Sequence, residues 1–387
     1  MSQATATVTD PAGDSGPHRS QSPGPPGGGP APSGPSAPPA LSDPSASAAP
    51  PDHPAPSLPG SDFAPLLRAV KSQGLLERRT GRYAFGIAAN LAALGAVVTS
   101  LVLLGDTWWS LLLVPPLALL WARTAFIAHD AGHAQISGDR RTNKWIGLVH
   151  ANLLLGMNEA WWNDKHARHH ANPNHVDKDP DVGVGALVWT RKQAARREGF
   201  ARWLTCNQAR LFFPMLLLEG IALKIYGFAY LRCQQSRERT LAALLLVTHV
   251  VLYAGLLLST LSPGRAIVFA LLLHAVFGLH LGLAFAPNHK GMEMPDPDGE
   301  RWGHLQRQVL TSRNVRGTVL TDWLLGGLNH QIEHHLFPSM PRPHLRLARP
   351  LVKAHCASIG MPYAETGLTD SYRQALAHLR DVGEPLR

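Results

Sequence analysis

Four long apolar runs in the sequence restrict the chain to a membrane fold. They cover residues 83–105, 107–127, 240–262 and 266–287. Each has about the 20 residues that an α-helix needs to cross the hydrocarbon core of a bilayer. The whole chain is 45% hydrophobic and only 16% charged. We therefore expect an all-α integral membrane protein with four transmembrane helices, the second of which is kinked at Pro115 and Pro116.

Charged residues around these runs predict the orientation of the helices. Short turns join the first run to the second and the third to the fourth, so the helices form two hairpins with both termini on one side. The turns contain only Asp106 and Arg265 as charged residues, whereas basic residues flank the other ends of the runs. These flanking residues are Arg78, Arg79, Arg140, Arg141, Lys144, Arg237, Arg239 and Lys290. Because basic flanks stay in the cytoplasm, we expect a multi-pass protein of the cell (inner or plasma) membrane with both termini cytoplasmic.

The formal net charge of +9 is explained by the same flanks. Lysine and arginine beside apolar runs contact anionic lipid headgroups, so we expect membrane lipids and no nucleic acid as partners.

The segments outside the four runs are of three kinds. Residues 1–60 are rich in Pro, Ala, Gly and Ser, and we expect a disordered tail because they cannot bury enough apolar surface to fold. Residues 63–365 would form the membrane domain, and residues 366–387 a C-terminal cytoplasmic helix. Two weaker apolar segments, 145–162 and 211–230, are interrupted by charged residues. We expect both to lie in the membrane interface, with a fifth span in the second segment as the alternative.

Histidine is the residue type that the sequence concentrates most. The chain has 20 histidines but only three widely spaced cysteines, which excludes a cysteine-based metal site. Three clusters have i, i+3 or i, i+4 spacing, which in the third is counted from Gln331. This spacing places the side chains on one face of a helix. The clusters are His129 with His133; His166, His169 and His170; and His334 with His335, while His289 follows the fourth run. All lie at the predicted cytoplasmic boundary, which indicates one metal centre there.

The number of histidines bears on the metal. Eight imidazoles exceed the four ligands of a tetrahedral zinc site, so two metal ions are indicated. Imidazole also binds Fe, Cu, Zn and Ni, so ligand type alone does not choose the metal. We expect the remaining histidines to be structural, including His249, His274 and His280 within the spans and His330 beside the third cluster.

Three stretches carry a resemblance to a known family. They are HDAGH (129–133), WWNDKHARHHANPNHVDKDPD (161–181) and NHQIEHHLFPSMPRPHLRLARP (329–350). The chain resembles the membrane fatty acid desaturases from about Phe63 onward. It is most similar to their bacterial acyl-CoA and acyl-lipid members and to front-end desaturases of the delta-5/delta-6 type.

The resemblance implies a cytoplasmic helical cap that carries two irons. The residues that match the family's iron ligands are His129, His133, His166, His169, His170, His334 and His335, with His289 as an additional ligand. Gln331 matches a glutamine that front-end members carry in place of a histidine. Gln331, Asp130, Glu333 and Asn288 are therefore possible ligands, or side chains that orient the ligands.

The resemblance also implies an activity and its partners. It predicts that O2 and two electrons introduce a cis double bond into a long-chain acyl group, carried by coenzyme A or by a lipid, within an apolar tunnel between the spans. Many front-end members contain a cytochrome domain with an HPGG haem motif, which this sequence lacks. We therefore expect a separate electron donor, a ferredoxin or similar carrier with its reductase.

Three other functions fit parts of the same pattern. A related di-iron hydroxylase or ketolase of lipids would use identical ligands, and its products would distinguish it. A zinc-dependent membrane hydrolase would contain zinc and act without O2. A non-catalytic metal-binding membrane protein would consume no O2.

Overall fold

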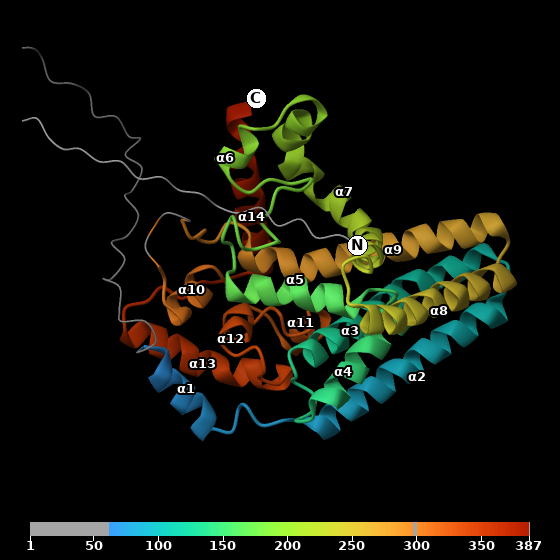
Figure 1. Cartoon of the computed structure of the whole chain (residues 1–387), viewed down its shortest axis with the longest axis horizontal. Coiled ribbons are helices and arrows are strands. Elements are labelled where there is room, and N and C mark those ends of the chain that lie inside the picture. Colours follow the sequence, from blue (N-terminus) through green and yellow to red (C-terminus); the bar gives the residue numbers. More distant parts are fainter. Residues whose placement is uncertain (1–61, 297–298, 300, 387) are drawn as a thin grey trace, which may run out of the picture. The chain divides into compact units, whose positions relative to one another are not determined.

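The computed structural model describes residues 62–296, 299 and 301–386, so the tail predicted at residues 1–60 lies outside the described residues. The described part is mostly helical (Figure 1). The long helices are α2 (Thr80–Leu104), α3 (Val114–Gly132), α7 (Gly199–Tyr230), α8 (Ser236–Thr260) and α9 (Pro263–His289). The shorter helices are α1 (Phe63–Ser72), α4 (Arg140–Leu148), α5 (Glu159–Ala171), α6 (Arg191–Ala194), α10 (His304–Leu310), α11 (Val319–Leu324), α12 (Gln331–Leu336), α13 (Arg342–Ser358) and α14 (Leu368–Gly383). Three other helical segments, η1 (Trp108–Leu113), η2 (Val149–Leu155) and η3 (Glu384–Leu386), and two strands, β1 (Asn314–Val315) and β2 (Glu365–Thr366), are also present.

Five helices in the described part are long and apolar enough to cross a membrane: α2, α3 with η1, α7, α8 and α9. The expected count of four is therefore not confirmed, and the two-hairpin arrangement stays a prediction. The additional candidate is α7, which contains the weaker segment 211–230 within one 32-residue helix. The other weaker segment, 145–162, is not a single helix, because it runs from α4 through η2 into α5.

The outer surface of the long helices is apolar. Large side chains on α2, α8 and α9 are more than half exposed, although burial would be favourable for each of them. They include Phe85, Leu103, Leu244, Val251, Leu258, Ile267 and Leu271. Such a surface is stable when hydrocarbon surrounds it, which agrees with a membrane protein.

The two prolines of the second apolar run do not kink a helix. The 3₁₀ segment η1 ends at Leu113 and α3 begins at the next residue, so Pro115 and Pro116 lie in the first turn of α3. A proline costs little there, because the first amides of a helix have no carbonyl partner within it. The predicted kink is therefore wrong. α3 also continues to Gly132 and so carries His129 within the helix.

The centre of the bundle lies between α3, α7 and α9. Trp121 of α3 packs edge-on against Phe277 of α9, with the ring centroids 5.6 Å apart. α7 approaches α9 closely at two glycines, since a Cβ on Gly220 would lie 2.3 Å from the carbonyl oxygen of His274. A Cβ on Gly278 would lie 2.4 Å from the backbone nitrogen of Gly220. These contacts fix the position of α9 along α7, and therefore the position of the last residues of α9.

A second apolar core supports the C-terminal part of the histidine site. Leu66 and Val70 of α1 are buried in the same cluster as Ile332 of α12 and Val352 of α13. Strand β1 pairs in parallel with β2 through Asn314 and Glu365. The six residues of α12 are all buried, so the third histidine cluster is held on every side.

Candidate metal centre

The predicted site histidines come from four elements. α3 supplies His129, and His133 caps its C-terminus. α5 carries His166, His169 and His170, α12 carries His334 and His335, and His289 is the last residue of α9. α5 starts where it does because the Asn158 side chain accepts hydrogen bonds from the amides of Ala160 and Trp161. The helical spacing then places the three imidazoles of α5 toward one site.

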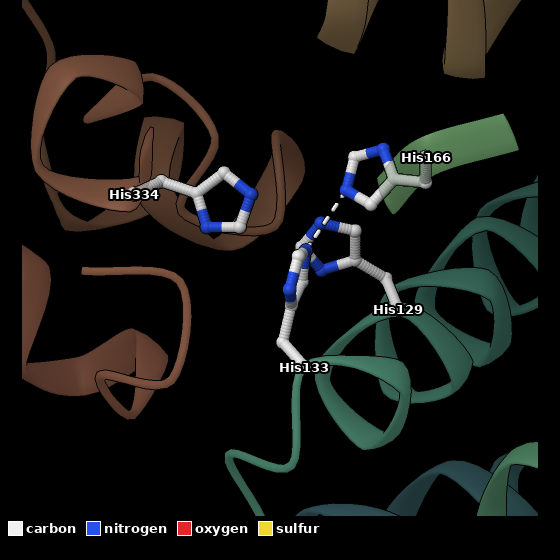
Figure 2. A group of neighbouring side chains, drawn as sticks. All are labelled: His129, His133, His166 and His334. Carbon is white, nitrogen blue, oxygen red and sulfur yellow. Dashed lines mark hydrogen bonds between the residues drawn. The ribbon is translucent and has the colours of Figure 1, made fainter. Parts of the chain in front are cut away.

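Four of these histidines form a first group, shown in Figure 2. One ring nitrogen from each of His129, His133, His166 and His334 lies within 4.8 Å of the others. The Nε2 atoms of His133 and His166 are 2.9 Å apart. Helices α3, α5 and α12, which are distant in sequence, therefore meet at one point.

A second group adjoins the first. The Nε2 atom of His289 lies 3.3 Å from that of His169 and 3.1 Å from that of His335. His170 links the groups, because its Nε2 is 3.0 Å from that of His166 and its ring stacks on His335 with 4.1 Å between centroids. All eight predicted histidines are thus brought together in two adjacent groups.

In the second group, hydrogen bonds to Nδ1 determine the ring orientation. The Nδ1 atom of His289 donates to the carbonyl oxygen of Thr311 at 2.9 Å, and that of His335 donates to Oε1 of Gln308 at 2.9 Å. Asp179 accepts from Nδ1 of His169 at 2.9 Å. A neutral imidazole that donates from Nδ1 has its lone pair on Nε2, which here points at the other rings.

Burial keeps five of the rings neutral. It holds the pKa of five histidines well below the ordinary value, and neighbouring imidazoles lower these pKa values further. The five are His133, His166, His170, His334 and His335. A neutral imidazole is the form that binds a metal.

The donor set fits metal ions. Within the described part of the chain, Nε2 of His129, Nδ1 of His170 and both ring nitrogens of His334 are buried without a hydrogen-bond partner. Such unpaired buried nitrogens are costly unless another ligand satisfies them. Pairs of Nε2 atoms about 3 Å apart also face each other, which a metal between them would explain.

A third cluster of possible ligands, His169 with Asp179 and Asp181, has a different character. Asp181 forms a close ion pair with Lys165. Burial raises the pKa of Asp179, but the hydrogen bond with His169 outweighs it and leaves that pKa below the ordinary value. The two carboxylates are thus ionised partners that orient His169 and balance Lys165.

The four remaining predicted residues lie around the groups. Nε2 of Gln331 is 2.9 Å from Nε2 of His289, so Gln331 reaches the second group directly. Asn288 donates to Oε1 of Gln331 at 3.3 Å and thereby positions this amide. Asp130 accepts from Nδ1 of His129 at 3.1 Å. Among the described residues, Glu333 hydrogen-bonds to Asn314 and Tyr363 and thus supports α12 instead of a histidine ring.

Three positioning groups were not predicted. Asp179 lies within the stretch that carries the second cluster, and a carboxylate ten residues after His169 was a usable signal. Gln308 and the carbonyl of Thr311 come from α10 and the residue after it, where the sequence shows no pattern. His330, expected to be structural, lies 3.1 Å from a carboxylate oxygen of Asp322 through its Nε2.

Comparison with known proteins shows that most of the chain is similar to fatty acid desaturases. The fatty acid desaturase family matches residues 106–367. Fatty acid desaturase 3 of Bos taurus is 32% identical over 314 residues, which are 78% of this chain and 68% of that protein. Delta(8)-fatty-acid desaturase 2 of Arabidopsis thaliana is 29% identical over 350 residues, 84% of this chain and 77% of that protein. Acyl-lipid (9-3)-desaturase of Physcomitrium patens is 28% identical over 277 residues, 69% of this chain, and the match spans about half (52%) of its length. The chain therefore belongs to the fatty acid desaturase family of membrane-bound, oxygen-dependent oxidoreductases.

Proposed function

We propose that this chain inserts a cis double bond into a long-chain acyl group, with two irons held by the eight histidines of the two groups. The observation that supports this most is the direction of the rings: Nδ1 is tied to the protein in His169, His289 and His335, while Nε2 faces the centre. Bound iron would supply the O2 chemistry that removes hydrogen from two adjacent methylenes.

The protein's own part is to hold and shield this centre. Low pKa values keep His133, His166, His170, His334 and His335 neutral, so their ring nitrogens remain available as ligands. We assign His129, His133, His166 and His334 to one iron and His169, His289 and His335 to the other. His170 lies between the groups, and Gln331 is proposed as a ligand or support on the His289 side.

We infer the substrate from the relatives. Two of them are named as acyl-lipid (9-3) and delta(8) desaturases, which favours a front-end enzyme acting on acyl-lipid or acyl-CoA. Selection of the bond position would come from an apolar tunnel between the spans. A separate ferredoxin-like donor would supply electrons from the cytoplasm. The chain would lie in the cell membrane, with both termini and the metal site on the cytoplasmic side.

The test is expression in a host that lacks related desaturases, with the double bond located by mass spectrometry of the fatty acids. We expect a new unsaturated acid and two irons per purified chain. With His166→Ala or His334→Ala we expect loss of the unsaturated product and a lower iron content. His355→Ala is the control, because His355 lies on α13 and bonds to the Asp62 carbonyl away from both groups. Hydroxylated products would indicate the hydroxylase alternative, and bound zinc with O2-independent turnover would refute the proposal.

A further inference from the structure

The short helix α11 exposes apolar side chains although it is not a spanning helix. Val319 is 70% exposed, Leu320 63% and Trp323 41%. This arrangement would be unfavourable in water, because exposing three neighbouring apolar side chains to water costs free energy.

Three contacts hold α11 and the residues just after it against the long helices. Arg123 of α3 donates to the carbonyl oxygen of Trp323 at 3.2 Å. His280 of α9 donates from Nε2 to the carbonyl oxygen of Leu324 at 2.8 Å. Gly326, just after α11, lies so close to Phe126 that a Cβ would be 2.4 Å from the ring.

These contacts define the depth of α11 in the membrane. Arg123 and Phe126 lie in the apolar run 107–127, and His280 lies in the apolar run 266–287. With a rise of about 1.5 Å per residue, they precede the histidines at the ends of their helices by roughly 5 to 14 Å. Phe85 of α2, near the matching end of its own apolar run, is 77% exposed. The exposed face of α11 therefore continues the surface that contacts lipid.

Arg123 adds a charge at the same place. Its guanidinium carbon lies 4.4 Å from the centroid of the Trp323 ring. Within the described residues, no carboxylate lies at ion-pair distance from it. A cation within an apolar span requires an anion or the headgroup region, and tryptophan favours that same level. Guanidinium binds phosphate through two parallel hydrogen bonds.

We infer that α11 is inserted into the leaflet on the side of the histidine groups, and that Arg123 beside it binds the phosphate of a phospholipid. A phospholipid is favoured over a soluble phosphate compound because the cation and the apolar face of α11 form one surface, and only a lipid offers a phosphate with acyl chains attached. This inference does not depend on the metal or on the reaction.

Spin labelling in lipid nanodiscs tests the insertion. A nitroxide is attached at Leu320→Cys in a Cys206→Ser, Cys233→Ser background, which must itself take up no label. Leu258→Cys on α8 and Arg373→Cys on α14 serve as the lipid and water references. We expect the label at position 320 to collide with O2 in preference to a water-soluble nickel complex, as at position 258. Accessibility to nickel like that at position 373 would overturn the insertion.

Native mass spectrometry tests the phosphate site with phosphatidylglycerol as the probe. We expect Arg123→Met to lose the most tightly bound lipid, Arg123→Lys to keep it with reduced affinity, and Arg373→Gln to bind as the unmodified chain does. The Lys variant also shows whether loss in the Met variant reflects misfolding. Coenzyme A and inorganic phosphate are added as competitors. Unchanged binding by Arg123→Met, or displacement by either competitor, would overturn the phospholipid assignment.

Discussion

Each histidine ring of the second group divides its two nitrogens between the protein and the centre. Nδ1 bonds to a carboxylate in His169, to a carbonyl in His289 and to an amide in His335. Two of these acceptors belong to α10 and the residue after it, and the third lies in the loop after α5. Ring orientation therefore depends on the folded cap and not on α5, α9 or α12 alone. Ligand geometry is thus sensitive to residues that never touch a metal.

Asp179 is the acceptor most suited to a test. Its carboxylate also accepts from the backbone amide of Asn174 at 2.8 Å, so it is rigidly placed. We expect Asp179→Asn to lower iron affinity about 10- to 100-fold, because the ring of His169 loses the nearer of its two carboxylate partners. Competition with a chelator, followed by metal analysis, measures this. Asp177→Asn on the exposed side of the same loop is the control, and equal affinities of the two variants would contradict the assigned role.

At the scale of elements, the segment after α11 depends on a glycine that no other residue replaces easily. Gly326 has φ +62°, and its missing Cβ leaves room for the ring of Phe126. Gly360 has φ +69°, and a Cβ at that residue would meet nothing within 4 Å, which makes it a matched comparison. The two positions share a left-handed backbone and differ in packing.

Substituting alanine at each of these two glycines should therefore distinguish the cost of backbone strain from the cost of steric overlap between the new Cβ and its neighbours. We expect Gly360→Ala to cost about 1–2 kcal/mol, as a non-glycine residue does in the left-handed region. Gly326→Ala should cost a further 1–3 kcal/mol or so, because Phe126 or α11 must move. Thermal unfolding of the detergent-purified variants gives the comparison. Equal unfolding midpoints of the two variants would show that the contact with Phe126 does not contribute to stability.

The long helices could be predicted from sequence because their length and apolar composition are local properties. The helical spacing of the clusters likewise predicted which imidazoles share a face. Position within the fold was harder to predict: Pro115 and Pro116 begin a helix because η1 precedes it, which their own residue type does not reveal. α11 has six residues, too few for a periodic pattern, and Gln308 is recognisable only once α10 and α12 pack together.

At the scale of the whole molecule, the histidine groups join segments that the chain separates widely. The first group unites α3, α5 and α12, and the second unites α5, α12 and the end of α9. The mutual approach of eight imidazoles brings unpaired ring nitrogens together and contributes no attraction of its own. The cap should therefore depend on what binds between the rings.

Metal removal is expected to destabilise the folded chain as a whole. A ligand that binds only the folded state stabilises it by about 4 kcal/mol when its free concentration is about 1,000 times Kd. We expect chelation to lower the unfolding midpoint of the purified protein and iron to restore it, because the bound metals link α3, α5, α9 and α12. In His334→Ala the first group loses a ligand that comes from α12, so the shift on adding iron should shrink. His355→Ala should keep the full shift, since its ring lies outside both groups. If the unfolding midpoint of the unmodified chain did not depend on iron, packing alone would hold these helices together. The metal centre would then contribute nothing to the stability of the fold.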